Sequence, residues 1–152
     1  HVVQIDESKF SKRKYNVGRI ERSPWVIGGI DLITKDVFFV EVFSRDSTTL
    51  LNIILENVEE GTTIYTDKWK GYINLNQYYH HLDVNHTTNF VDPITGANTQ
   101  LIESTWNSYK KLFKARSINS NSNITDYFYE FMFKKKYGNS AFIIIMENLY
   151  EL

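Results

Sequence analysis

Three acidic residues stand where predicted strands end or a predicted helix begins, and this placement limits the folds that the chain can adopt. Asp6 follows the apolar run at 2–5, and Asp67 follows the β-branched run at 62–66. Glu103 lies near the start of a stretch whose apolar residues have helical spacing. Carboxylates from two strands and a helix can together hold two Mg²⁺ or Mn²⁺ ions about 3.5–4 Å apart. The pattern therefore predicts a two-metal site for phosphodiester chemistry, with these three acids as its ligands.

Each of these acids also has another interpretation. Glu7 competes with Asp6, because neighbouring residues of a strand point to opposite faces and only one of them can join the site. The spacing does not choose between the two. Asp67 is also consistent with an ordinary acid at a strand end, and Glu103 with an acid favoured by the dipole at a helix start.

The order of the predicted elements favours an α/β fold built on a mixed five-stranded sheet flanked by helices. Strands are expected at 1–6, 24–31, 36–43, 62–66 and 81–86, and helices at 46–60, 69–77 and 100–116. Asp46 or Ser47 is expected to cap the first helix, and Gly61 to end it. The first three strands are predicted to be antiparallel. The fourth is predicted to return through a right-handed crossover and to lie parallel beside the first.

Length and composition indicate one compact core followed by helices. A chain of 152 residues, 42% of them hydrophobic, can bury roughly 68–70% of its unfolded surface. We expect a catalytic core at 1–116, a linker at 117–123, and helices within 124–152 that pack on the core or on a partner. The apolar run at 142–146 would indicate dimerisation if it proved exposed.

The chain contains no cysteine, which excludes disulfides, zinc ribbons and thiol nucleophiles. No stretch approaches the roughly 20 apolar residues that a membrane span needs, and no signal peptide is visible. We therefore expect neither membrane insertion nor secretion. The expected location is the nucleus in a eukaryote, or the cytoplasm and nucleoid in a bacterium. The chain starts inside a strand-like run, so we expect it to be part of something longer.

Basic residues form clusters although the net charge is only −1. One cluster lies at 9–22, a second at 110–116 and a third at 134–136. Basic stripes beside an acidic metal centre are typical of enzymes that act on DNA. The residues expected to contact DNA phosphates are Lys9, Lys12, Arg13, Lys14, Arg19, Lys110, Lys111 and Lys114. The third cluster is equally well explained as solvated surface.

Five segments of the sequence resemble blocks of a known family, in the same order. They are IDESKFSKRKYNVGR, WVIGGID, TTIYTDKWKGY, VNHTTNFVDPITGANT and IESTW. The chain resembles the Merlin-like DDE transposases and their bacterial insertion-sequence relatives, whose catalytic core has a ribonuclease-H-like, integrase-like fold. The resemblance implies Asp6, Asp67 and Glu103 as a triad that binds two Mg²⁺ or Mn²⁺ ions, without a small-molecule cofactor. It also implies DNA partners, namely the terminal inverted repeats of a mobile element and its target DNA, and a homodimer or larger assembly on DNA.

Four further residues are expected to support the site. Trp69 and Tyr72 are expected to anchor the short helix in the core, and His86 to have a structural or DNA-contacting role. The family usually has histidine where this chain has Asn98, so we expect hydrogen bonding there rather than proton transfer. The zinc-binding or helix-turn-helix region common at the N-terminus of full-length members is not in this sequence.

Two other functions remain open from the sequence. One is a domesticated relative that binds DNA but no longer cuts it. The other is a nuclease of the same fold that acts on RNA–DNA hybrids or junctions.

Overall fold

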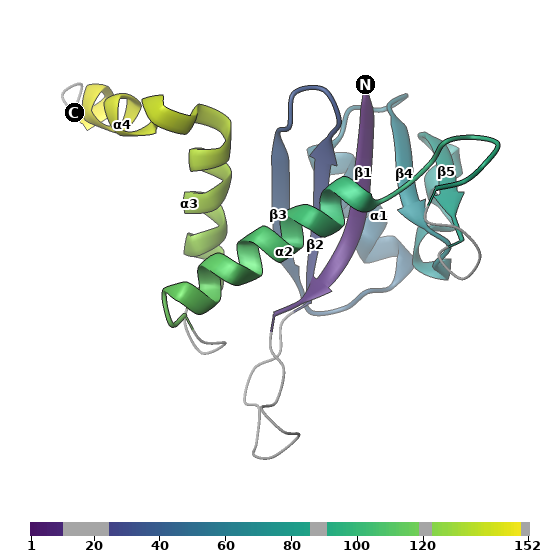
Figure 1. The fold of residues 1–152 in the computed structure, drawn as a ribbon. Coiled ribbons are helices and arrows are strands. Elements are labelled where there is room, and N and C mark those ends of the chain that lie inside the picture. Colours follow the sequence, from purple (N-terminus) through teal and green to yellow (C-terminus); the bar gives the residue numbers. More distant parts are fainter. Residues whose placement is uncertain (11–24, 86–90, 119–122, 150–152) are drawn as a thin grey trace, which may run out of the picture.

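A five-stranded sheet forms the centre of the protein (Figure 1). The computed structural model describes residues 1–10, 25–85, 91–118 and 123–149. The strands are β1 (Val2–Lys9), β2 (Trp25–Asp31), β3 (Val37–Val42), β4 (Thr63–Asp67) and β5 (His80–Val84). Their order in the sheet is β3-β2-β1-β4-β5. Strands β1, β2 and β3 are antiparallel, while β4 lies parallel to β1 and β5 parallel to β4. The predicted mixed sheet is confirmed.

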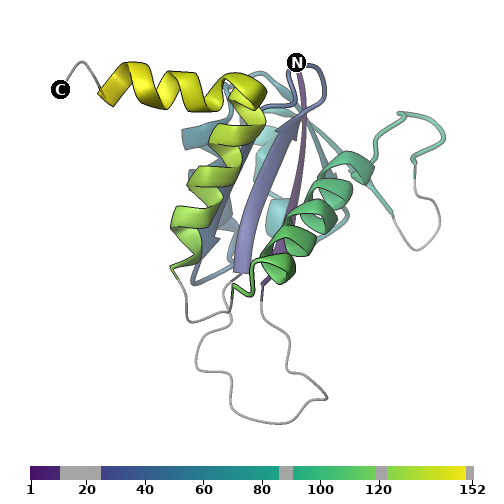
Figure 2. The ribbon, with the colours of Figure 1, turned by 60° about the vertical axis from the view of Figure 1, so that its left-hand side comes forward.

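Helices cover both faces of this sheet. Helix α1 (Ser47–Asn57) and the 3₁₀ turns η2 (Lys70–Tyr72) and η3 (Leu75–Gln77) lie on one face. Helices α2 (Gln100–Ala115) and α3 (Ile124–Tyr137) lie on the other, as the two views in Figures 1 and 2 show. A 3₁₀ turn, η4 (Gly138–Ser140), leads into α4 (Ala141–Leu149), which extends away from the sheet (Figure 2). None of the helices in the described part of the chain is long and apolar enough to cross a membrane.

The alternation of side chains along β1 divides the core into two layers. Val3 and Ile5 are buried in the layer beneath α1. Gln4, between them, is buried on the opposite face and bonds to α2. Because the side-chain period of a strand is two, Asp6 and Glu7 must also belong to different faces. This division decides which elements each acid can meet.

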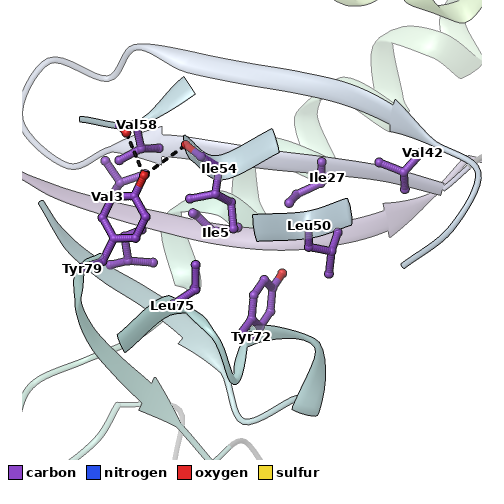
Figure 3. Packing of buried hydrophobic residues seen from close by; sticks show 11 residues of the cluster. Val3, Ile5, Ile27, Val42, Leu50, Ile54, Val58, Tyr72, Leu75 and Tyr79 are labelled. Carbon is purple, nitrogen blue, oxygen red and sulfur yellow. Dashed lines mark hydrogen bonds between the residues drawn. The ribbon is translucent and has the colours of Figure 1, made fainter. Parts of the chain in front are cut away.

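Helix α1 begins where the sequence predicts but ends earlier. Asp46 is the N-cap, and its side chain accepts a 2.9 Å hydrogen bond from the backbone N–H of Thr49. The helix was expected to run to Gly61, yet it ends at Asn57, because Val58 turns to an extended conformation and enters the core. The hydroxyl of Tyr79 donates to the carbonyl oxygens of Ile54 and Val58, at 3.3 and 2.8 Å (Figure 3). The end of α1 is thus set by tertiary contacts rather than by the glycine.

Two other boundaries differ from the sequence-based expectation. Strand β1 was expected to end at Asp6, but it continues to Lys9 because its last residues pair with β2. The single helix expected at 69–77 is instead two short 3₁₀ turns. Tyr72 and Leu75 are both buried under α1, and a spacing of three residues aligns side chains in 3₁₀ rather than α geometry. Because β1 continues to Lys9, Asp6 lies inside this strand and not at its end.

Replacing Tyr79 by phenylalanine tests how the end of α1 is held. We expect Tyr79→Phe to lower the free energy of unfolding by about 0.5–1.5 kcal/mol, because the carbonyl of Val58 loses this donor, whereas that of Ile54 keeps the backbone N–H of Val58. The measurement is urea denaturation followed by circular dichroism. Tyr78→Phe is the matched control, since the neighbouring hydroxyl makes no hydrogen bond to a described residue and the side chain is 39% exposed. Equal loss in both variants would contradict this role of Tyr79.

Candidate functional site

Asp6 and Asp67 come from neighbouring parallel strands and lie at the same edge of the sheet. Gln4 of β1 is paired with Tyr65 of β4, and each acid stands two residues further along its strand. The two carboxylates therefore share one face, the face that α2 covers. Both side chains are half-buried. Glu103 joins them from the first turn of α2, where its side chain is exposed.

A single buried side chain positions the start of α2 on β1. Gln4 is 1% exposed, and its Oε1 accepts hydrogen bonds from the backbone N–H groups of Leu101 and Ile102, at 2.9 and 3.0 Å. Its Nε2 donates to Oδ1 of Asn98 at 2.9 Å. The first N–H groups of a helix have no partner within the helix, so Gln4 caps α2 from another element. Glu103 follows directly after these bonded residues.

Glycine in β2 allows α2 to approach the sheet beside Asp6. Gly28 is paired with Asp6 across the β1–β2 ladder. A Cβ at position 28 would lie 2.6 Å from the indole ring of Trp106 and 2.6 Å from the ring of Phe39. Trp106 is one turn after Glu103 on α2, so the close approach that Gly28 permits also keeps Glu103 near the strand acids. The Gly-Gly pair in WVIGGID was a signal for this approach that the sequence interpretation did not use.

The three acids influence one another electrostatically. Burial first, and then the nearby charges of Asp67 and Glu103, raise the pKa of Asp6 to about 6 against the opposing effect of hydrogen bonding. The indole Nε1 of Trp106 lies close enough to Asp6 to favour its charged form, but it is not aligned for a hydrogen bond with any described residue. The fold thus brings together three carboxylates whose first and last members are 97 positions apart in the sequence (103 − 6).

Glu7, the alternative to Asp6, lies on the opposite face. Burial raises its pKa to about 7, while the hydroxyl of Tyr72 and, more weakly, Arg45 favour its charged form. Its Oε1 is buried and has no hydrogen-bond partner among the described residues. Glu7 faces Tyr72 of η2 and is influenced by Arg45 in the loop after β3, on the face opposite α2. The two candidates of the sequence analysis are therefore separated by face, and Asp6 is the one that shares its face with Asp67 and Glu103.

The donor atoms suit a hard divalent cation. All three side chains offer only carboxylate oxygens, which are the ligands that Mg²⁺ and Mn²⁺ prefer. Their mutual repulsion is the kind of charge imbalance that a cation relieves. Within the residues that the structure describes, no group of three or more His, Asp or Glu side chains is arranged to hold a metal ion. The carboxylate of Glu103 instead accepts a 2.7 Å hydrogen bond from the hydroxyl of Thr99.

Several predicted supporting residues have clear positions. Tyr72 is 1% exposed in the core, whereas Trp69 is half-buried and its backbone N–H donates to Oδ1 of Asp67 at 3.2 Å. The Oδ1 of Asn98 accepts a hydrogen bond from Gln4, so Asn98 belongs to the contacts that hold the start of α2. Four of the basic residues are placed, and all lie outside the core: Lys9, Lys110, Lys111 and Lys114. Lys12, Arg13, Lys14, Arg19 and His86 lie outside the described residues.

Comparison with known families identifies the chain. The family model described as the ISXO2-like transposase domain matches residues 3–136, and the chain belongs to this family of transposase domains. This agrees with the resemblance to bacterial insertion-sequence transposases. A comparison with curated protein sequences finds no match.

Solved structures with a similar fold include chains of viral proteins. A chain of the simian T-cell lymphotropic virus intasome, in complex with PP2A regulatory subunit B56 gamma, is 17% identical with a TM-score of 0.63. The match covers 88% of this protein and 47% of that chain, so this protein spans about half of its length. The magnesium-bound HTLV-2 integrase catalytic core domain, in its trimeric form, is 13% identical with a TM-score of 0.64, covering 91% and 86%. The predicted integrase-like, ribonuclease-H-like fold is confirmed.

Shortening Gln4 tests whether it anchors α2. We expect Gln4→Ala to lower the free energy of unfolding by about 1–3 kcal/mol, because buried N–H groups at the start of α2 lose their acceptor. Chemical denaturation measures this loss, and hydrogen exchange should show faster exchange at Leu101 and Ile102. Gln77→Ala is the control, since that side chain is exposed and bonds to no described residue. Unchanged protection of these two amides would show that α2 is anchored elsewhere.

Proposed function

We propose that this member of the ISXO2-like transposase family cleaves DNA at the ends of a mobile element and transfers the resulting strand, using two divalent cations. The observation that supports this most directly is the convergence of Asp6, Asp67 and Glu103 from three separate elements onto one edge of the sheet. Burial, together with the charges of Asp67 and Glu103, raises the pKa of Asp6. Such an arrangement opposes folding unless a cation compensates it, which favours a functional role.

In this proposal Asp6, Asp67 and Glu103 would hold Mg²⁺ or Mn²⁺. The bound ions would stabilise negative charge on the attacked phosphate and on the attacking and leaving oxygens. Strand β1 and β4 hold two of the ligands on a rigid sheet, and Gln4 keeps α2 in register with β1. Oε1 of Glu103 accepts the hydrogen bond from Thr99, and the carboxylate keeps further lone pairs that could bind a cation. The protein supplies ligands and their positions, and no side-chain nucleophile is needed.

The distribution of basic side chains supports DNA as the substrate. Lys110 lies with its Nζ 5.5 Å from the ring centroid of Phe10, which directly follows β1. This contact links the middle of α2 to the same sheet edge as the acids. Lys111 and Lys114 are exposed further along α2. A phosphate backbone lying along α2 would therefore meet positive charge next to the carboxylates.

We propose that the active form is a homodimer or larger assembly. Four apolar side chains of α4 are exposed: Phe142 (71%), Ile143 (57%), Ile145 (47%) and Leu149 (59%). Three of these residues belong to the run at 142–146, whose exposure was the condition for inferring dimerisation from the sequence. The HTLV-2 integrase core has been solved in dimeric and trimeric forms. An uncovered apolar helix is consistent with pairing, and two subunits could hold two DNA ends.

The triad is tested by a carboxylate-to-amide change. We expect Asp67→Asn to reduce Mg²⁺-dependent cleavage of supercoiled and element-end DNA at least about 100-fold, because an amide is a poor ligand and lacks the charge. We expect Mn²⁺ to raise the melting temperature of the unsubstituted chain and Asp67→Asn to abolish this rise. The change in melting temperature reports binding of the cation independently of catalysis. Gel analysis and scanning fluorimetry are the measurements.

Asp36→Asn is the matched control for this experiment. Asp36 is exposed at the opposite end of the sheet, and its carboxylate has no partner among the described residues. Equal cleavage by the chain and by Asp67→Asn would refute the triad. DNA binding without cleavage in the unsubstituted chain, even with Mn²⁺, would instead favour a domesticated relative. Preferential cleavage of RNA–DNA hybrids would favour the nuclease.

The DNA path along α2 is tested through salt dependence. We expect Lys111→Gln combined with Lys114→Gln to reduce the slope of log K against log salt concentration by roughly 2, since each lost phosphate contact removes about 0.9. Fluorescence anisotropy with duplex DNA measures it. The control is Lys135→Gln with Lys136→Gln, because the end of α3 lies at the opposite end of the molecule from the tip of β1 (Figures 1 and 2). An unchanged slope in the α2 variant would remove this helix from the interface.

A further inference from the structure

Arg45, in the loop between β3 and α1, lies between two tryptophan rings. Its guanidinium carbon is 3.6 Å from the ring centroid of Trp25 and 4.9 Å from that of Trp69. Arg45 and both indoles are half-buried. The loop itself is ordered by the N-cap of α1, where Ser44 and Thr49 bond to the carboxylate of Asp46. The guanidinium is thus held by cation–π contacts with both indole rings.

The hydrogen-bonding capacity of Arg45 is not used within the described part of the chain. Its guanidinium makes no hydrogen bond and no ion pair with any described residue. The charge of Arg45 lowers the pKa of Glu7, but burial and three other effects on that carboxyl are larger. A guanidinium carries five N–H donors in a planar fork that matches the oxygens of a phosphate. A rigid arginine with unused donors is therefore suited to an anionic ligand.

Phe43, two residues before Arg45, exposes nearly its whole side chain. It is 98% exposed, the highest value among the large apolar residues of the described chain. In the same loop, Arg45 already contacts aromatic rings. A nucleic-acid base offers a flat face that can cover such a ring, and base stacking on an aromatic side chain contributes about 1–3 kcal/mol.

The loop lies at the same sheet edge as the three acids. The ladder pairs Lys9 with Trp25 and Trp25 with Val42, so the ends of β1 and β3 meet the start of β2 there. Lys9 adds a second cation, with its Nζ 5.5 Å from the ring centroid of Trp25. Exposed lysines flank Trp69 at positions 68 and 70. Aromatic rings interleaved with basic groups are typical of grooves that bind single-stranded nucleic acid.

We propose that the β3–α1 loop binds an unpaired nucleotide of the DNA next to the cleavage site. Arg45 binds a backbone phosphate through its guanidinium fork, and Phe43 stacks on the base. The base must be unpaired, because a base inside a duplex has both faces covered by its neighbours. The inference rests on the proposed function in that DNA is the substrate, but it concerns binding and not cutting.

The test uses the whole chain carrying Asp67→Asn, without divalent cations, so that binding is measured separately from cleavage. The probes are a fluorescein-labelled single strand, the matching duplex, and the duplex with a frayed end that carries 2-aminopurine. We expect Phe43→Ala to weaken binding to the single strand and the frayed end roughly fivefold or more. Binding to the blunt duplex should change much less. The fluorescence change of 2-aminopurine on binding should also be lost.

Arg45 is tested by two substitutions. Arg45→Lys keeps the charge but loses the fork, and we expect it to weaken binding to the frayed end. Arg45→Gln should in addition reduce the salt slope on the single strand by about 0.7. The matched controls are Tyr129→Ala, for an aromatic side chain that is 61% exposed on α3, and Lys136→Gln. Lys136 is also a cation close to an aromatic ring, that of Tyr137, but lies at the other end of the molecule.

The outcomes separate this inference from the proposed function. Binding of Phe43→Ala and Arg45→Gln that matches the controls on every probe would overturn the nucleotide site, whether or not the chain cuts DNA. Loss of binding in these variants, with no cleavage by the unsubstituted chain, would support the site and refute the proposed activity. Phe43 is exposed, so its variant is expected to fold even if Arg45→Gln loosens the tryptophans. Melting temperatures check this.

Discussion

The side-chain amide of Gln4 joins the sheet to α2, and the relative position of the three acids depends on this link. Gln4 is two residues before Asp6 on β1, and the amides it binds directly precede Glu103 on α2. An amphipathic helix on a sheet can slide or rotate when only apolar contacts hold it. The contact of Trp106 with Gly28, one turn further along, provides a second anchor. Two anchors a turn apart restrict both movements, so a strand and a distant helix behave as one unit.

The same region carries an electrostatic cost. The pKa of Asp6 in the folded chain, about 6, lies above its ordinary value of 3.8. A raised carboxyl pKa means that the folded state binds the proton more tightly than the unfolded state, so stability falls as the pH rises through this interval. At neutral pH the ionised acid therefore opposes folding. Sites that work against stability are commonly functional, and this one has the oxygen donors that a divalent cation needs.

Much of the architecture could be predicted from the sequence, because local patterns determine it. Strand alternation and helical spacing predicted the sheet and α2, and Asp46 predicted the start of α1. The errors lie where a distant contact decides. Strand β1 extends beyond Asp6 because β2 offers partners, and α1 ends at Asn57 because the core admits Val58.

The residues that the sequence did not reveal act across long separations. Gln4 bonds to residues 94 to 98 positions away, and no short motif records such a contact. Arg45 could not be singled out from the sequence, because its position depends on two tryptophans from other parts of the chain. The family resemblance implied a histidine at the position of Asn98. Its bond to Gln4 gives it a place in the structure that does not need proton transfer.

If the proposed function holds, the alternation of β1 would allow one narrow edge of the sheet both to bind DNA and to hold the metal ions. Asp6 faces α2 with the other two acids, while Glu7 and Lys9 face the side of α1, where Arg45 stacks on Trp25. A DNA strand that crosses this edge passes from the aromatic and basic groups on one face to the carboxylates on the other. Positive charge is then needed only along this path, so a net charge of −1 over the whole chain does not count against DNA as the substrate. In the proposed function, the period of two along a single strand would place recognition and chemistry within a few residues of each other.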